Sequence, residues 1–135
     1  MSLEIKQRER EGIVVLDLKG RITVGDEAGA LRLAFSTLAG ADKVILNLQH
    51  VEYIDSTGLG ALVLGFTSLR KRAGRLVLEN LSRRNIELLL FTKLTTVFEL
   101  FNDEQDAVNS FFPDREIQHF DILSFVKDQS GQDSV

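Results

Sequence analysis

Strand-like and helix-like segments alternate along most of this 135-residue chain, and no other feature constrains its fold as strongly. Short apolar runs at residues 13–18, 43–48 and 75–79 are typical of strands. The stretches between them repeat their apolar residues at helical spacing. Because strands that alternate with helices favour parallel pairing, we expect one α/β domain with a mixed, mostly parallel sheet and about four helices.

The other elements fit the same arrangement. Residues 3–6 alternate apolar and charged side chains, which indicates a half-buried strand. The run at 43–48 is almost continuously apolar, so we expect a central strand covered on both faces. A short edge strand is expected at 97–101. Helices are predicted over residues 26–38, 59–72, 85–92 and 103–112.

The only proline, Pro113, marks a boundary near the end of the chain. We assign residues 1–112 to the compact domain and residues 113–135 to a C-terminal extension. Apolar residues in the extension recur at every third position, which predicts an amphipathic helix over 115–127. The polar segment from Asp128 onward is expected to be a flexible tail. The recurring apolar residues are Ile117, Phe120, Leu123 and Val126.

Composition argues against several classes of protein. No apolar run approaches the ~18 residues of a membrane span, and no basic and apolar leader is recognisable. The formal net charge of −4 argues against nucleic acid as the main partner. Cysteine is absent, which excludes disulfides, thiolate metal sites and thiol catalysis. We therefore expect a cytoplasmic protein with no cofactor or metal and with neither nucleic acid nor membrane as a partner.

The segment Asp55-Ser56-Thr57 lies where a predicted strand passes into a predicted helix. A helix N-terminus leaves backbone N–H groups unpaired and carries a partial positive charge, so it favours a serine cap and also accepts an anion. A phosphate on Ser56 would add a charge of roughly −1.5 to −2. Two interpretations stay open. Ser56 is a helix cap worth about 1 kcal/mol, or it accepts the phosphate of a binding switch.

Four motifs in fixed order carry a resemblance. The most specific is DSTGLG at residues 55–60, between a strand and a helix. The others are GRI at 20–22, RAGRL at 72–76 and LTTVFELF at 94–101. With its elements in this order, the chain resembles the STAS domain of bacterial anti-sigma factor antagonists. The resemblance covers roughly residues 3–112 and implies the α/β fold of that family.

The resemblance also implies a function in transcription regulation and signal transduction. Proteins of this family bind an anti-sigma factor, which is also a serine kinase, only while they are unphosphorylated. A metal-dependent serine phosphatase reverses the modification. By position, Ser56 is the phosphate acceptor, Thr57 a secondary hydroxyl and Asp55 the acidic residue. The expected partner-binding residues are Asp55, Ser56, Thr57, Gly58, Leu59, Arg21 and Thr23.

These residues also have simpler structural interpretations. As a turn residue, Asp55 would bond nearby backbone amides; alternatively it orients the adjacent hydroxyl or meets the metal and nucleotide of the kinase. Gly58 and Gly60 are expected to permit close approach by a partner or by a neighbouring strand. Arg21 and Thr23 are expected in a loop after the second strand, where solvation alone would explain them.

Catalysis finds little support in the sequence. Ser56 lacks the glycine two positions earlier that a hydrolase nucleophile requires, because Ile54 stands there. His50 and His119 are far apart, and neither has metal-ligand spacing. No paired acidic motif stands out among the carboxylates. We therefore expect a regulator that is not an enzyme.

Two other functions stay open at this stage. In the first, the chain is a STAS subunit of a larger signalling scaffold, in which phosphorylation drives the exchange of partners. In the second, it is an accessory STAS subunit of a lipid transporter. The serine at position 56 favours the switch, because transporter subunits of this kind often lack the acceptor. We expect a monomer or a weak homodimer.

Overall fold

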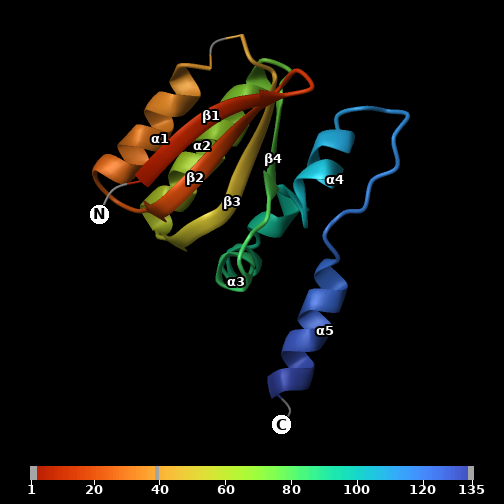
Figure 1. Cartoon of the computed structure of the whole chain (residues 1–135). Coiled ribbons are helices and arrows are strands. Elements are labelled where there is room, and N and C mark those ends of the chain that lie inside the picture. The colour runs from red at the N-terminus through yellow and green to blue at the C-terminus, as the bar shows by residue number, and fades with distance from the viewer. Residues whose placement is uncertain (1–2, 39, 134–135) are drawn as a thin grey trace.

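The computed structural model describes residues 3–38 and 40–133, and it contains a five-stranded sheet in the order β1-β2-β3-β4-β5. β1 is antiparallel to β2, and every other neighbouring pair is parallel. The sheet is thus mixed and mostly parallel, which confirms the fold class predicted from the sequence (Figure 1). The strands are β1 (Leu3–Arg10), β2 (Ile13–Ile22), β3 (Lys43–Ile54), β4 (Arg75–Glu79) and β5 (Glu99–Phe101).

Helices cover both faces of this sheet. Apolar residues of α1, α2 and α3 share one core cluster with the strands. Residues Ala107 and Val108 of α4 belong to a second cluster, which uses the alternate strand positions and hence the opposite face. The helices are α1 (Asp26–Ser36), α2 (Ser56–Lys71), α3 (Arg83–Phe91), α4 (Glu104–Asn109) and α5 (Ile122–Asp133), with a 3₁₀ turn at Leu94–Thr96.

The central strand β3 is covered on both faces, as the sequence predicts. Val44, Ile45 and Leu46 each have 0% of their surface exposed. Val44 and Leu46 lie in the cluster beneath α1 and α2, whereas Ile45 lies in the cluster beneath α4. A continuous apolar run is therefore required here, because consecutive side chains in a strand point to opposite faces.

Two strands extend further than the sequence indicates. Residues 20–22 and 51–54, expected in connections, continue β2 and β3 as a parallel pair, with Arg21 opposite Tyr53. Two register shifts occur before this point, between Asp17 and Lys19 and between Gly20 and Arg21. The polar residues in these segments are typical of a loop. In the structure they belong to the strand ends, where the register shifts let the two strands stay paired.

Smaller differences occur at the other element ends. The third helix begins at Arg83 because the Ser82 side chain caps it, accepting a hydrogen bond from the backbone N–H of Asn85 at 3.2 Å. β5 is shorter than the predicted strand, and α4 ends at Asn109 rather than at residue 112. These shifts displace no core residue from the expected face.

The extension differs more from expectation. The helix predicted over 115–127 lies at Ile122–Asp133, and residues 113–121 are irregular. The Asp121 side chain sets the new start by accepting a hydrogen bond from the backbone N–H of Ser124 at 3.1 Å. The segment from Asp128, expected to be flexible, is helical through Asp133, and the last two residues lie outside the described range. The division at residues 112 and 113 stays a prediction.

Candidate functional site

Asp55 caps α2 and joins it to the end of β2. Its Oδ1 accepts a hydrogen bond from the backbone N–H of Gly58 at 2.8 Å, which is the bond of a helix N-cap. Its Oδ2 accepts a second bond from the backbone N–H of Val24 at 2.9 Å. The backbone N–H of Asp55 also donates to the carbonyl oxygen of Ile22 at 3.2 Å. One carboxylate therefore holds the β2–α1 connection against the first turn of α2.

The residue that caps α2 is not Ser56, the proposed phosphate acceptor. Ser56 is not the cap, because Asp55 precedes it and takes that position, so the prediction of a Ser56 cap is wrong. Ser56 is instead the first residue of α2, and it is exposed. Within the described part of the chain its hydroxyl has no hydrogen-bond partner. Aspartate and serine are both favourable N-cap residues, and they are adjacent here. Asp55 is the cap because the backbone is still extended at Asp55 and helical from Ser56.

Asp55 stays ionised beside this hydroxyl. Hydrogen bonds from the backbone N–H groups of Gly58 and then Val24 hold the pKa of the Asp55 carboxyl below its usual value. The N-terminus of α2 has no basic residue in its first turn to counter that charge. Any further negative charge on Ser56 would consequently be placed next to an existing carboxylate.

Gly58 is required by the close approach of two backbones. A Cβ atom at this position would lie 1.9 Å from the carbonyl oxygen of Ile22, so no other residue fits without displacement of the turn. Gly60 is different, because a Cβ atom there would meet nothing within 4 Å. The expectation of a tight contact within the domain therefore holds for Gly58 and not for Gly60, whose exposed backbone stays open to a partner.

The remaining predicted partner residues differ in how accessible they are. Arg21 is exposed, and it lies in β2 rather than in the following loop. Thr23 and Thr57 are half-buried, and the carbonyl oxygen of Thr23 accepts a hydrogen bond from Ala28 at 3.0 Å. Leu59 belongs to the core, with 8% of its surface exposed, so it has the least side-chain surface to offer. The fold nevertheless brings the two segments together at one end of the sheet.

A basic and aromatic surface adjoins this site. The guanidinium of Arg84, in the first turn of α3, lies 5.2 Å from the centre of the Tyr53 ring. A cavity of about 320 Å³ opens between the end of β3 and α3, and Tyr53, Arg84 and Leu88 are among its lining residues. Phe91, on the same rim, is 89% exposed. Exposed aromatic and arginine side chains of this kind are common at protein interfaces.

Comparison with known proteins decides the family. The STAS domain family matches residues 4–107, which is most of the chain. The chain belongs to the STAS domain family. The anti-sigma-B factor antagonist of Bacillus subtilis (strain 168) is 37% identical to it over 110 residues, which cover 80% of this chain and 99% of the relative. This relative places the chain among the anti-sigma factor antagonists of the family.

Solved structures show the same fold for this STAS domain. The unphosphorylated anti-sigma factor antagonist SpoIIAA has a TM-score of 0.64 at 18% identity, over 83% of this chain and 100% of that chain. An anti-sigma factor antagonist from Mycobacterium paratuberculosis has a TM-score of 0.70 at 20% identity, over 80% of this chain and 92% of the other. The arrangement of sheet and helices is therefore that of known antagonists.

The two histidines belong to different segments of this STAS domain. His50 lies exposed on β3, whereas the ring of His119 lies beside that of Phe101, with 5.2 Å between the ring centres. Residues 3–38 and 40–133 contain no group of three or more His, Cys, Asp or Glu residues arranged to hold a metal ion. Over the same residues, no helix has the length and apolar character needed to cross a membrane.

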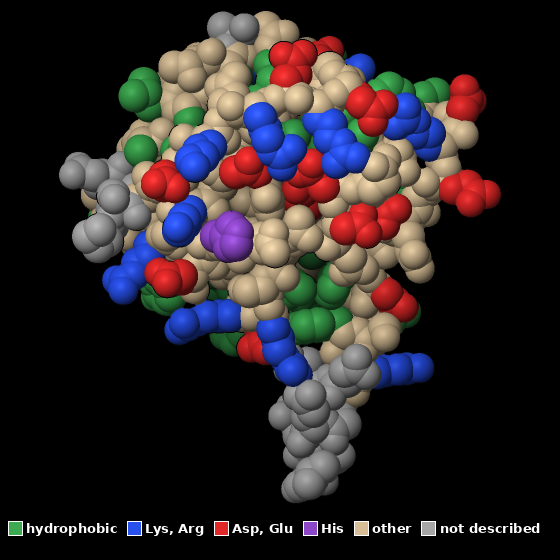
Figure 2. Space-filling view, viewed as in Figure 1, with side chains coloured by type: hydrophobic (Ala, Val, Ile, Leu, Met, Phe, Trp, Pro, Cys, Tyr) green, Lys and Arg blue, Asp and Glu red, His purple; other side chains and the backbone are tan. Residues whose placement is uncertain are grey.

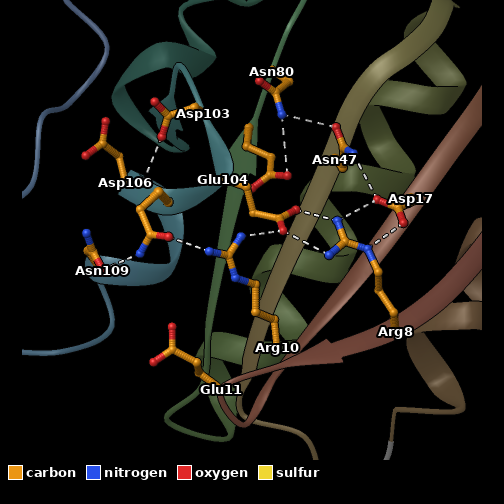
Figure 3. Close-up of polar contacts among 12 residues, drawn as sticks. Arg8, Arg10, Glu11, Asp17, Asn47, Asn80, Asp103, Glu104, Asp106 and Asn109 are labelled. Carbon is orange, nitrogen blue, oxygen red and sulfur yellow. Dashed lines mark hydrogen bonds and ion pairs between the residues drawn. The ribbon is translucent and has the colours of Figure 1, made fainter.

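A polar cluster on the α4 face of the STAS domain was not predicted from the sequence. Asp17, Asn47 and Glu79 lie opposite one another on β2, β3 and β4, and each interrupts or ends an apolar run. That shared interruption is the signal that could have revealed them. Arg8 of β1 and Glu104 of α4 complete the cluster (Figure 3). Figure 2 shows that acidic and basic side chains are interleaved over this side of the molecule.

Proposed function

We propose that this STAS domain is a phosphorylation-gated anti-sigma factor antagonist. In its unphosphorylated form it binds an anti-sigma factor that is also a serine kinase. Phosphorylation of Ser56 releases that partner, and a serine phosphatase restores binding. The chain acts through this exchange of partners and not as an enzyme.

The position of Ser56 is the observation that carries this proposal. The hydroxyl is exposed, lies on the first residue of α2 and makes no hydrogen bond within the described structure. A kinase can therefore reach it without breaking a contact that the fold needs. Asp55, not Ser56, performs the structural task of capping the helix. The relative that is 37% identical, an anti-sigma-B factor antagonist, supports the same function.

Electrostatics explains how the phosphate would release the partner. A phosphoserine adds roughly −1.5 to −2 charges next to the ionised Asp55. In the free protein this charge faces water and the positive end of α2. In an interface it would have to be desolvated beside a like charge, which costs several kcal/mol. Since about 1.4 kcal/mol corresponds to a factor of ten, we expect at least a hundredfold loss of affinity.

The free domain does not need to refold when it is phosphorylated. Asp55 is held by the backbone N–H groups of Gly58 and Val24, and neither bond involves the Ser56 side chain. The phosphate would thus act by blocking a surface and not by reshaping it. That surface would include Arg21, Thr23 and the exposed side of α2. Thr57 is half-buried, which makes it the less accessible of the two hydroxyls.

The proposal is tested by mass spectrometry after incubation with ATP and the serine kinases encoded by the same genome. We expect a single added phosphate that maps to Ser56 and is absent in Ser56→Ala. Ser68→Ala, which changes an exposed serine further along α2, is the matched control and should be phosphorylated like the wild type. If no kinase modifies the chain and it co-purifies with scaffold or transporter subunits, the switch function is wrong.

A further inference from the structure

Glu79 is a carboxylic acid in the interior of the protein. It ends β4, and 0% of its surface is exposed. Its neighbours across the sheet are Asn47 on β3 and Phe101 on β5. Its position alternates with that of Leu78, so its side chain points to the face that α4 covers. A carboxyl group is therefore enclosed between the sheet and α4.

The surroundings of Glu79 do not suit a carboxylate. Its Oε1 atom has no hydrogen-bond partner among the described residues. Its Oε2 atom accepts a long bond, 3.5 Å from the Nδ2 atom of Asn80, and the other side chain that the carboxyl meets is Glu104, itself an acid. No ion pair of the described structure includes Glu79. A buried charge without a partner is strongly unfavourable, so the group is expected to keep its proton.

The nearby cations are engaged by other acids. Glu104 of α4 meets the Glu79 carboxyl. It is bonded to Arg8 at 2.9 Å and to Arg10 at 2.8 Å (Figure 3). Arg8 is also bonded to Asp17 of β2 at 2.7 Å. Asp17 in turn accepts a bond from the Nδ2 atom of Asn47 at 2.9 Å. The charged groups of β1, β2 and α4 are thus paired with one another, and the charge of Arg8 favours the Glu79 carboxylate less than burial and Glu104 disfavour it.

Glu79 and Glu104 consequently differ in protonation: Glu79 keeps its proton and Glu104 is ionised. Burial, then the hydrogen bond with Glu104 and its negative charge, raises the pKa of the Glu79 carboxyl to about 9. The hydrogen bond from Arg8, with further support from Glu79 and Arg10, lowers the pKa of Glu104 to about 2. Across the neutral range the pair therefore holds one proton. A proton on Glu79 also gives its buried carboxyl a donor for the Glu104 carboxylate.

We propose that protonated Glu79 is a latch that holds α4 against the sheet and that weakens as the pH rises. The observations behind it are a fully buried carboxyl, an oxygen without a partner and an opposing carboxylate on the helix. When α4 separates from the sheet, Glu79 meets water and releases its proton to it. Rising pH therefore favours the open form. The latch does not involve Ser56 and is independent of the proposed function.

The direction and the range of the effect follow from proton linkage. The closed form keeps the proton up to about pH 9, whereas a solvated glutamate loses it near about pH 4.3. The closed form thus binds one more proton between these values, and opening should increase up to about tenfold for each pH unit. The pKa values of Asp17 and Glu104 are lowered, so these groups titrate below this range.

Hydrogen exchange measures this opening directly. In the full chain, the amides of Ala107 and Val108 on α4 are followed between pH 6 and 8.5 and corrected for the intrinsic exchange rate. We expect the opening constant of the wild type to rise severalfold to about tenfold per pH unit. Glu79→Gln keeps a neutral hydrogen-bonding group and should remove this dependence. Glu52→Gln, on the exposed part of β3, is the control and should behave like the wild type.

Two outcomes would overturn the latch. One is the same pH dependence in Glu79→Gln as in the wild type. The other comes from the wild type alone, and so does not require the variant to fold. In that measurement, the side-chain carboxyl carbon of Glu79 is followed by NMR through a pH titration. A midpoint close to that of a solvated glutamate would show that Glu79 is ionised at neutral pH and that no latch exists.

Discussion

At the scale of single residues, Asp55 links α2 to the β2–α1 connection, next to the proposed phosphate acceptor Ser56. Replacing it by alanine removes the cap of α2 and the bond to Val24 together. We expect Asp55→Ala to lower the free energy of unfolding by about 1–3 kcal/mol, because a cap is worth about 1 and a second N–H loses its partner. Urea denaturation measures this loss.

A second capping aspartate provides the comparison. Asp103 caps α4 through one hydrogen bond, from the backbone N–H of Asp106 at 2.9 Å. Asp103→Ala should therefore cost less than Asp55→Ala, about 0.5–1 kcal/mol. An equal loss in the two variants would mean that the bond to Val24 adds nothing. The sequence suggested Asp55 as a turn residue, but it could not show this bond, because the two positions are brought together only by the pairing of β2 with β3.

At the scale of elements, we expect alanine substitutions at two glycines of α2 to change the unfolding free energy in opposite directions. Gly58→Ala would force a Cβ atom against the carbonyl oxygen of Ile22, so we expect a loss of about 1–3 kcal/mol in unfolding free energy. Gly60→Ala meets nothing within 4 Å and lies inside the helix, so we expect a gain of about 0.5–1 kcal/mol. Urea denaturation of the two variants compares them, and a similar change in both would contradict the described packing.

Element types were predicted better than element ends. The apolar runs of β2, β3 and β4 and the helical stripe of α2 identify their structures, because burial imposes their period. The ends depend on single side chains. Ser82 starts α3 and Asp121 starts α5, and a polar residue of this kind is as common in loops as at caps. The helix predicted over 115–127 was therefore displaced toward the C-terminus.

At the scale of the whole molecule, the sequence revealed the fold class but not the contacts between distant segments. The pairing of Arg8 with Glu104 joins residues at opposite ends of the domain, and no local pattern announces it. The same holds for the burial of Glu79, which depends on α4 covering that face of the sheet. The DSTGLG motif at residues 55–60 was informative because its residues are adjacent in the sequence.

The switch and the latch occupy separate parts of the molecule and should act independently. β3 runs from Asn47, beside Glu79, to Ile54, just before the switch, so roughly 20 Å separates the two sites. We expect the effects of Ser56→Glu and Glu79→Gln on the free energy of unfolding to add within about 0.5 kcal/mol, because they share no neighbour. Urea denaturation of the wild type, both single variants and the double variant tests this. A coupling well above that value would show that β3 transmits strain between its two ends, and phosphorylation would then alter the hold of the sheet on α4.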